Sequence, residues 1–268
     1  MNRWQKRVVL VTGGSAGLGR AIAGAFGQQG ASLVLASRGA EALEETATAL
    51  RTSHNVEVLA VTADVTQDAD VENLIRSIVD RFGRLDVLVN CVGRSSRGDL
   101  ASTPIEQFED LLQVNFLAAV RCTRAALPHL LKSRGHVVNI GSLASKTASP
   151  HLGPYAASKF PLVAFSQQLR LEYGAAGLHT LLVCPGPLKR DDAGARYDAQ
   201  AANLPDSARK PGGGAKIASI DPHLLATRIV RACERRKPEL VVPGRARLLF
   251  ALAALWPNLG DWLVRRNT

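Results

Sequence analysis

The sequence is poor in aromatic residues and in cysteine. Phenylalanine, tryptophan and tyrosine together make up 5% of the 268 residues, so the chain offers no platform of rings on which nucleic-acid bases could stack. The cysteines form no Cys-x-x-Cys pair and no His-containing metal spacing, which predicts no metal site and a reduced, cytoplasmic setting. They are Cys91, Cys122, Cys184 and Cys233.

Long apolar runs are also missing. The apolar residues that follow the basic stretch Met1–Arg7 end after Val11, so this region predicts a first strand and not a signal peptide. Near the C-terminus, Leu248–Trp256 is apolar but too short to span a bilayer, which needs about 20 residues.

Acidic residues are in the minority. The chain has 23 Asp and Glu against 33 Lys and Arg, a formal net charge of +10 at pH 7. Such an excess attracts phosphates and anionic surfaces. Because the basic residues are spread along the chain and lack a stacking platform, they favour a phosphorylated cofactor or an anionic membrane as partner, and not a nucleic acid.

Short apolar runs recur along the chain, separated mostly by segments of helical length. This alternation predicts an α/β fold, with a doubly wound, Rossmann-type parallel seven-stranded sheet in a three-layer α/β/α sandwich. We expect one catalytic domain over residues 1–244, followed by a tail over residues 245–268. The expected strands are Val8–Val11, Ser32–Ala36, Val56–Val61, Val87–Asn90, Val137–Ile140, Leu181–Cys184 and Leu240–Val242.

Two helix starts are marked by residue type. Thr103–Glu106 has the pattern of a capping box with a proline in the first turn, and Asp221-Pro222 repeats the combination of cap and proline.

A glycine-rich turn, Thr12–Gly19, lies between the first predicted strand and the first predicted helix. Gly13, Gly17 and Gly19 allow a sharp turn, close approach of a phosphate and tight packing of helix on strand. The turn therefore predicts a dinucleotide site at the positive end of the helix. Alone, the turn is also compatible with a purely structural loop.

Tyr155 and Lys159 are spaced i, i+4 in a predicted helix that begins near Pro154. This spacing places the phenol and the ammonium group on one face. A tyrosine has a pKa of about 10 in water, and a nearby cation favours its ionised form. We therefore expect Lys159 to lower the pKa of Tyr155.

These motifs together resemble the short-chain dehydrogenase/reductase family, from the first strand to Pro185-Gly186. The resemblance implies a catalytic tetrad of Asn115, Ser142, Tyr155 and Lys159. Tyr155 would exchange a proton with the substrate oxygen, Ser142 would bond that oxygen, Lys159 would contact the ribose and Asn115 would hold a water. Taken singly, Ser142 could instead cap a turn, and Asn115 could bond the backbone of its own helix. The implied cofactor contacts are Gly13, Ser15, Gly17, Leu18, Gly19, Ser37, Arg38, Asp64, Val65, Asn90, Gly93, Tyr155, Lys159, Pro185 and Gly186.

The sequence departs from the family pattern at Cys91 and Val92, within its Asn-Asn-Ala-Gly motif. Arg190 stands where the family often has a threonine that holds the nicotinamide amide, so we expect that contact to differ.

The end of the second predicted strand indicates the cofactor. An acidic residue there favours NAD because it bonds the ribose 2′-hydroxyl. Ser37 and Arg38 stand there instead, and a guanidinium and a hydroxyl suit a 2′-phosphate, so the sequence predicts NADP(H).

Two segments fall outside the regular alternation. Residues 187–220 are rich in glycine, proline and charge, which suits a lid over a substrate pocket or a plain surface insertion. The tail combines Leu248–Trp256 with Arg245, Arg247, Arg265 and Arg266, which suits peripheral contact with an anionic membrane or packing on the fold.

The sequence thus predicts an NADP(H)-dependent oxidoreductase for an apolar ketone or secondary alcohol. The resemblance implies a homo-dimer or homo-tetramer. The alternative is a nucleotide-sensing or membrane-surface scaffold protein with the same fold and weak catalysis.

Overall fold

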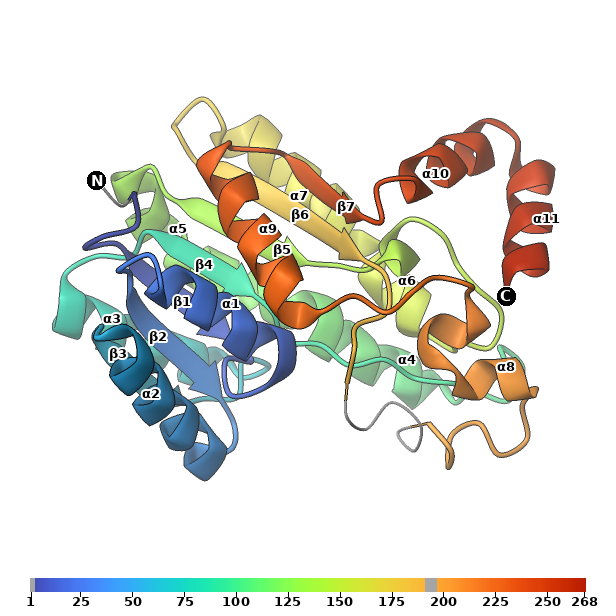
Figure 1. The fold of residues 1–268 in the computed structure, drawn as a ribbon, viewed down its shortest axis with the longest axis horizontal. Helices are drawn as coiled ribbons and strands as arrows, with labels where there is room; N and C mark the ends of the chain where they lie inside the picture. The colour runs from blue at the N-terminus through green and yellow to red at the C-terminus, as the bar shows by residue number, and fades with distance from the viewer. Residues whose placement is uncertain (1–2, 191–196) are drawn as a thin grey trace.

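A seven-stranded parallel sheet forms the centre of the molecule, in the order β3-β2-β1-β4-β5-β6-β7. The computed structural model describes residues 3–190 and 197–268. The predicted doubly wound α/β sandwich is confirmed (Figure 1). The strands are β1 Val8–Thr12, β2 Ser32–Ser37, β3 Val58–Thr62, β4 Val87–Asn90, β5 His136–Ile140, β6 His179–Pro185 and β7 Glu239–Val242.

Helices cover both faces of the sheet because the central strands are buried on both sides, as their continuous apolar runs require. Helices α1, α2 and α9 pack on one face, and α3, α5 and α7 on the other. The helices are α1 Gly17–Gly27, α2 Ala40–His54, α3 Asp68–Phe82, α4 Ile105–Leu112, α5 Ala118–Ser133, α6 Tyr155–Lys159, α7 Pro161–Tyr173, α8 Asp206–Arg209, α9 Pro222–Glu234, α10 Ala246–Leu255 and α11 Pro257–Asn267. A π-helix, Gln113–Leu117, joins α4 to α5, and 3-10 helices span Leu143–Ser145 and Pro211–Gly214.

The two expected helix starts turn out differently. Asp221 caps α9, since its carboxylate accepts hydrogen bonds from the N–H groups of His223 at 2.7 Å and Leu224 at 3.3 Å. The capping box at Thr103 is wrong. Helix α4 begins at Ile105 after Pro104, without a side-chain cap, because the Thr103 hydroxyl donates to the carbonyl of Asp99 in the preceding turn.

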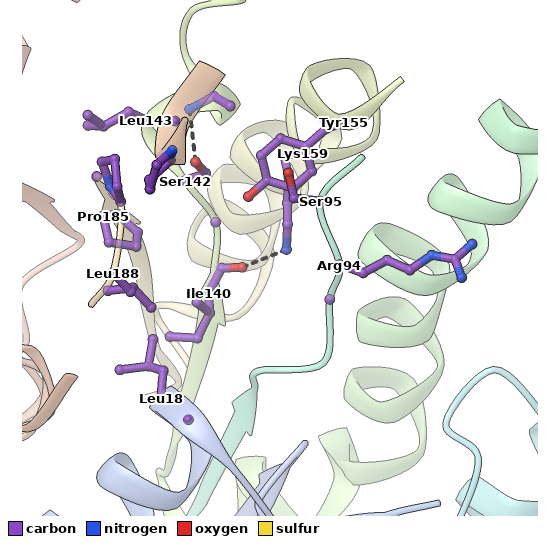
Figure 2. Close-up of a pocket in the computed structure, with 18 of the residues that line it drawn as sticks. Leu18, Arg94, Ser95, Ile140, Ser142, Leu143, Tyr155, Lys159, Pro185 and Leu188 are labelled. Atoms are coloured by element: carbon purple, nitrogen blue, oxygen red, sulfur yellow. Dashed lines mark hydrogen bonds between the residues drawn. The ribbon is translucent and has the colours of Figure 1, made fainter. Parts of the chain in front are cut away.

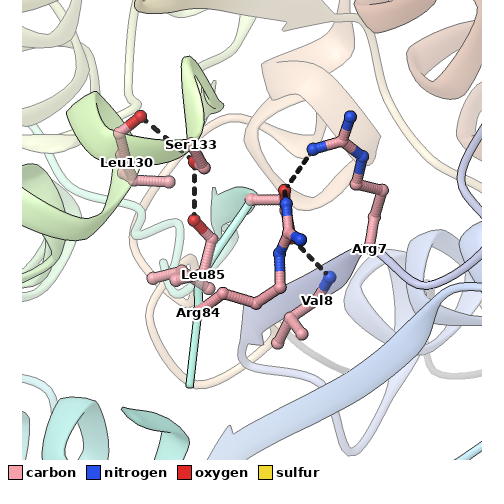
Figure 3. Close-up of polar contacts among 7 residues, drawn as sticks. Arg7, Val8, Arg84, Leu85, Leu130 and Ser133 are labelled. Atoms are coloured by element: carbon pink, nitrogen blue, oxygen red, sulfur yellow. Dashed lines mark hydrogen bonds and ion pairs between the residues drawn. The ribbon is translucent and has the colours of Figure 1, made fainter. Parts of the chain in front are cut away.

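The buried carboxylate of Asp86 ties together the amino ends of β1 and β4. Figure 3 labels its partners Arg7, Val8 and Arg84. The carboxylate accepts from the Val8 N–H at 2.9 Å, from Arg7 at 2.7 Å and from Arg84 at 2.6 Å. Burial alone would raise the pKa of Asp86, but the hydrogen bonds from Arg84, Val8 and Arg7 hold it below its usual value. The nearby hydroxyl of Ser133, the last residue of α5, donates to the Leu85 carbonyl at 2.8 Å.

The C-terminal tail forms a helical hairpin of α10 and α11 that projects beyond β7 (Figure 1). Its first residue, Ala246, is buried in a cluster with Leu182, Cys184 and Val241. Its far end meets the 187–220 segment, where the Lys216 N–H donates to the Asn267 carbonyl at 3.0 Å. The hairpin is therefore anchored at both ends.

Candidate functional site

A cavity of about 2550 Å³ lies at the carboxyl ends of the strands. Its walls include the residues that follow every strand of the sheet, which is where ligands bind in open parallel sheets. Most of the site residues expected from the sequence line it: Gly13, Ser15, Gly17, Leu18, Gly19, Ser37, Arg38, Asp64, Val65, Gly93, Ser142, Tyr155, Lys159, Pro185 and Gly186. Asn90 and Asn115 are not among its lining residues.

The glycine turn has the geometry of a phosphate cradle. Gly13 and Gly17 have φ values of +68° and +52°, which residues with side chains rarely adopt. A Cβ at Gly19 would lie 2.1 Å from the Gly13 carbonyl oxygen, so only glycine allows α1 to approach β1 this closely. The N-cap of α1, Ala16, has no side chain that could accept from the first-turn N–H groups. Those donors and the helix dipole are therefore available to an anion.

Arg38 is exposed at the end of β2, and Asp64 follows β3 at the same edge of the cavity. The hydrogen bonds from Thr66, together with the positive charge of Arg38, hold the pKa of Asp64 below its usual value. Asp64 Oδ1 accepts from the Thr66 N–H at 3.0 Å and from the Thr66 hydroxyl at 2.7 Å. The turn after β3 is thus fixed by its own hydrogen bonds.

Asn90 belongs to a buried polar network on the α5 side of the sheet. Its side-chain amide donates to Thr123 Oγ1 at 3.0 Å and to Asn139 Oδ1 at 2.9 Å, and Asn139 donates to Ser166 Oγ at 3.0 Å. The Asn90 side chain is thus held in this network and does not line the cavity, and the expected cofactor contact of Asn90 stays a prediction. The sequence pattern identified the position but not the direction of the side chain.

Asn115 lies in the π-helix and is 1% exposed. Its Oδ1 accepts from the Arg94 N–H, and its Nδ2 donates to the Arg94 carbonyl and to Ser158 Oγ, each at 2.9 Å. Its partners are thus the loop after β4 and helix α6, and not its own helix. A Cβ at Gly93 would lie 2.8 Å from Asn115 Oδ1 and 2.9 Å from Lys159 Nζ, so glycine leaves the space in which these two side chains meet.

Lys159 is 4% exposed, and its Nζ donates to the Ile140 carbonyl at 3.0 Å (Figure 2). Burial disfavours the charged form and lowers the pKa of Lys159 to about 8. An ammonium has three donors, so this bond leaves others available toward the cavity.

Tyr155 and Ser142 face the same part of the cavity as Lys159 (Figure 2). Contrary to expectation, the pKa of Tyr155 is raised, because burial outweighs the Ser142 hydroxyl and the charges of Arg190 and Arg97, all of which lower it. The ammonium group that we expected to lower this pKa instead donates to the Ile140 carbonyl. A neutral phenol is the form that can donate a proton.

Ser142 caps the 3-10 helix after β5, as one interpretation of the sequence allowed. Its Oγ accepts from the Ala144 N–H at 3.1 Å, while its own N–H donates to Ser145 Oγ at 3.0 Å. Capping occupies one lone pair of the Ser142 oxygen and leaves its proton free for an acceptor in the cavity. The two roles are compatible.

The 187–220 segment forms one wall of the cavity. Its ends are joined by the bridge between Leu188 and Ile220, and Pro211, Gly212 and Ile217 are among its lining residues. Residues 191–196 of the expected lid lie outside the described residues. Arg190, at the position of the family's threonine, is exposed and lines the cavity.

Arg97 is a site residue that the sequence did not reveal, because it is one of many arginines in the chain. It is 3% exposed, and its guanidinium lies 3.7 Å from the ring centroid of Tyr197. It donates to the carbonyls of Ala208 at 2.5 Å and Lys210 at 3.2 Å. Burial lowers the pKa of Arg97. This side chain joins the loop after β4 to the 187–220 segment.

The far wall of the cavity is apolar and comes from the tail. Leu249 and Leu252 of α10 and Leu263 of α11 line it. The sequence predicted an apolar tail but not its place in the wall of the cavity.

Comparison with known proteins identifies the family. The family model described as short chain dehydrogenase matches residues 7–201. The chain belongs to the short-chain dehydrogenase family. It is 32% identical to L-fucose dehydrogenase of Mus musculus, over 97% of this chain and 96% of that protein. It is 38% identical to 2-(R)-hydroxypropyl-CoM dehydrogenase of Xanthobacter autotrophicus, over 68% of this chain and 75% of that protein.

Solved structures agree with the family assignment. L-sorbose reductase of Gluconobacter frateurii, complexed with NADPH and L-sorbose, superposes with a TM-score of 0.79 at 25% identity, covering 89% of this chain and 95% of that one. A short-chain dehydrogenase of Streptomyces avermitilis superposes with a TM-score of 0.79 at 28% identity, covering 98% and 97%. The chain is therefore an oxidoreductase of this family, and the cradle at Gly19 and the uncapped start of α1 fit a nicotinamide dinucleotide.

Proposed function

We propose that this chain is an NADP(H)-dependent oxidoreductase that reduces a ketone or oxidises a secondary alcohol on an apolar small molecule. The observation that carries the proposal is the convergence of Ser142, Tyr155 and Lys159 in the cavity that also contains the glycine turn (Figure 2). The apolar wall of Leu249, Leu252 and Leu263 supports the substrate class.

The proposed roles follow from charge development on the substrate oxygen. A bound nicotinamide supplies or accepts the hydride. Ser142 donates a hydrogen bond to the carbonyl oxygen, which becomes negative during reduction. Tyr155 then gives its phenolic proton to that oxygen and takes it back in the oxidative direction. Lys159, held by the Ile140 carbonyl, directs its remaining donors to ribose hydroxyls. Its positive charge stabilises the phenolate that forms when Tyr155 gives up its proton. Asn115 fixes the loop at Arg94 and the Ser158 side chain. We also propose that Asn115 holds a water next to Lys159.

Replacement of Tyr155 tests the reaction. Tyr155→Phe should lower kcat for carbonyl reduction about 10² to 10⁴-fold while NADPH binding, measured by calorimetry, is kept. Tyr173→Phe on α7 is the matched control, because Tyr173 packs against the core of the sheet and not in the cavity. If Tyr155→Phe reduces a panel of carbonyl compounds as fast as the wild type, the proposed acid is wrong. If wild-type protein binds NADPH but reduces none of the panel, the nucleotide-sensing alternative is favoured.

The preference for NADP(H) rests on Ser37 and Arg38 at the end of β2. Arg38→Asp should weaken NADPH binding by about tenfold or more, because a charge-assisted hydrogen bond to the 2′-phosphate is lost and a repulsion is gained. NADH binding should change little. Equal losses for both cofactors would show that Arg38 does not contact the phosphate.

The proposal includes a homo-dimer or homo-tetramer. Large apolar side chains at Ile105, Phe160 and Leu171 are exposed, at 67%, 44% and 76%, on or beside helices α4, α6 and α7. Light scattering on purified protein gives the oligomeric state, and an assembly through these helices should dissociate when Ile105 and Leu171 are replaced by Glu.

A further inference from the structure

The α10–α11 hairpin has a second apolar surface besides its cavity wall. Four large apolar residues at the turn between the helices and just after it, which we call the hairpin tip, are absent from the lining of the cavity. They are Leu255, Trp256, Leu259 and Trp262, with exposed fractions of 68%, 57%, 41% and 48%. An apolar cluster of this kind on a surface marks a binding site for another apolar surface.

Positive charge lies at the base of the hairpin, toward the body of the protein. Arg245 and Arg247 lie at the start of α10, and Arg265 and Arg266 at the end of α11, while Asp261 is the one acidic residue in 245–268. With a rise of about 1.5 Å per residue, Arg247 and Arg265 lie about 12 Å along their helices from the turn. A peripheral segment buries its apolar side about 5–10 Å below the lipid headgroups. A tip inserted to that depth would bring the arginines to the phosphate layer.

The hairpin is built to hold this shape. Gly260 of α11 is packed so closely on α10 that an added Cβ would lie 2.5 Å from the Ala253 Cβ. The anchors at Ala246 and at the Lys216–Asn267 hydrogen bond fix its base. Trp256 and Trp262 suit the interface, because amphipathic rings are enriched at the level of the headgroups.

We propose that the hairpin tip docks the protein on the surface of an anionic lipid bilayer. Within residues 3–190 and 197–268, no helix has the length and apolar character needed to cross a membrane, so the hairpin would lie in the interface. An anionic bilayer is favoured over a second copy of the chain at the hairpin tip, since a second hairpin would bring its own arginines against these four. Docking does not depend on the proposed reaction.

The experiment is vesicle sedimentation of the full chain, with phosphatidylcholine alone and with phosphatidylcholine mixed with phosphatidylglycerol. The wild type should bind the mixed vesicles, and added salt should weaken binding. Replacement of Arg265 by Gln should weaken it about fivefold. Replacement of Arg247 should weaken it less, because Arg247 also lies 3.5 Å from the Glu239 carboxylate. The double variant Trp256→Ser/Trp262→Ser should weaken it about tenfold or more.

Matched leucines provide the control. Leu255→Ser should weaken vesicle binding, whereas Leu224→Ser on α9 should not, although Leu224 is 64% exposed and Leu255 is 68% exposed. Fluorescence gives a second readout. Trp4 is 2% exposed, so a blue shift on adding mixed vesicles reports Trp256 and Trp262.

Three outcomes would overturn the proposal. The first is equal binding of the wild type to both vesicle types, and the second is equal effects of the two leucine variants on vesicle binding. The third is that the wild type binds no vesicles and forms an oligomer that the Trp256→Ser/Trp262→Ser variant does not form. The last outcome would assign the tip to a subunit interface. NADPH oxidation with a water-soluble ketone, which needs no vesicles, tests the proposed function separately.

Discussion

At the residue scale, the site contains a cation that is costly to bury. Lys159 is 4% exposed and has one backbone carbonyl as its hydrogen-bond partner. The lowered pKa of about 8 means that the folded protein binds this proton more weakly than the unfolded chain, where a lysine pKa is about 10.4. Burial of the Lys159 ammonium group next to Tyr155 therefore lowers the free energy of unfolding.

Lys159→Met should consequently stabilise the fold and abolish activity. Methionine fills similar space without a charge to desolvate, whereas the hydrogen bond to the Ile140 carbonyl is lost. The net effect should be a rise in the free energy of unfolding at pH 7 of about 1 kcal/mol or more. Between about pH 8 and pH 10 the unfolded state binds a proton that folded Lys159 has lost, so Lys159 contributes a rise in the free energy of unfolding with increasing pH. The variant should lack this rise.

Urea unfolding over that pH range checks both effects. Lys132→Met on the exposed side of α5 is the control, and it should leave stability and its pH dependence near those of the wild type. A Lys159→Met protein that is less stable at pH 7 would contradict the prediction.

At the scale of elements, the two ends of the sheet have different tasks. The cavity lies at the carboxyl ends, where the glycine turn and the uncapped N–H groups at the start of α1 are available to bind a ligand. The amino ends are closed by side chains, and Asp86 is the main example, since it holds the backbone of β1 from the start of β4 (Figure 3).

Asp86→Asn should destabilise the fold. Asp86 accepts four bonds, two at each oxygen, from Val8, Arg7 and Arg84. The amide can accept only at Oδ1, so it loses two of them, as well as the charge that strengthens all of them. We expect a loss on the order of 2 kcal/mol, because the two arginines are partly exposed and screened. Asp68→Asn is the control, since the Asp68 side chain is 79% exposed in its pair with Arg121. Equal midpoints of urea unfolding for the two variants would show that the Asp86 cluster contributes little.

At the scale of the whole molecule, the sheet and the site motifs could be predicted from the sequence because both depend on local patterns. Apolar runs gave the seven strands within a few residues, and the spacing of Tyr155 and Lys159 gave their shared face. The direction of the Asn90 side chain and the contacts of Arg97 could not be predicted, because partners distant in sequence determine them. The raised pKa of Tyr155 also depends on burial in the assembled fold, which no motif encodes.

The amino end of the sheet also contains a buried histidine pair that the sequence did not reveal. His136 and His179 begin β5 and β6, and their Nδ1 atoms are 2.8 Å apart, while His179 Nε2 lies 2.8 Å from the Lys237 carbonyl. Burial lowers the pKa of both rings, and the charge of Arg236 lowers it further. Cys233 completes the one group of potential metal ligands among the described residues, but the rings already use their nitrogens for each other and for Lys237.

This pair predicts how the whole protein responds to acid. In the unfolded chain a histidine pKa is about 6.5, and in the folded protein both values are lower, so below about pH 6.5 the unfolded state binds protons that the folded state excludes. The free energy of unfolding should therefore fall as the pH is lowered, by up to about 1.4 kcal/mol per pH unit for each histidine. His136→Gln keeps a donor for His179 but no longer titrates, so its urea unfolding between about pH 7 and pH 5 should show a shallower dependence than the wild type. His223→Gln, at an exposed position on α9, should keep the wild-type slope, and identical slopes for all three proteins would show that the buried pair does not control acid stability.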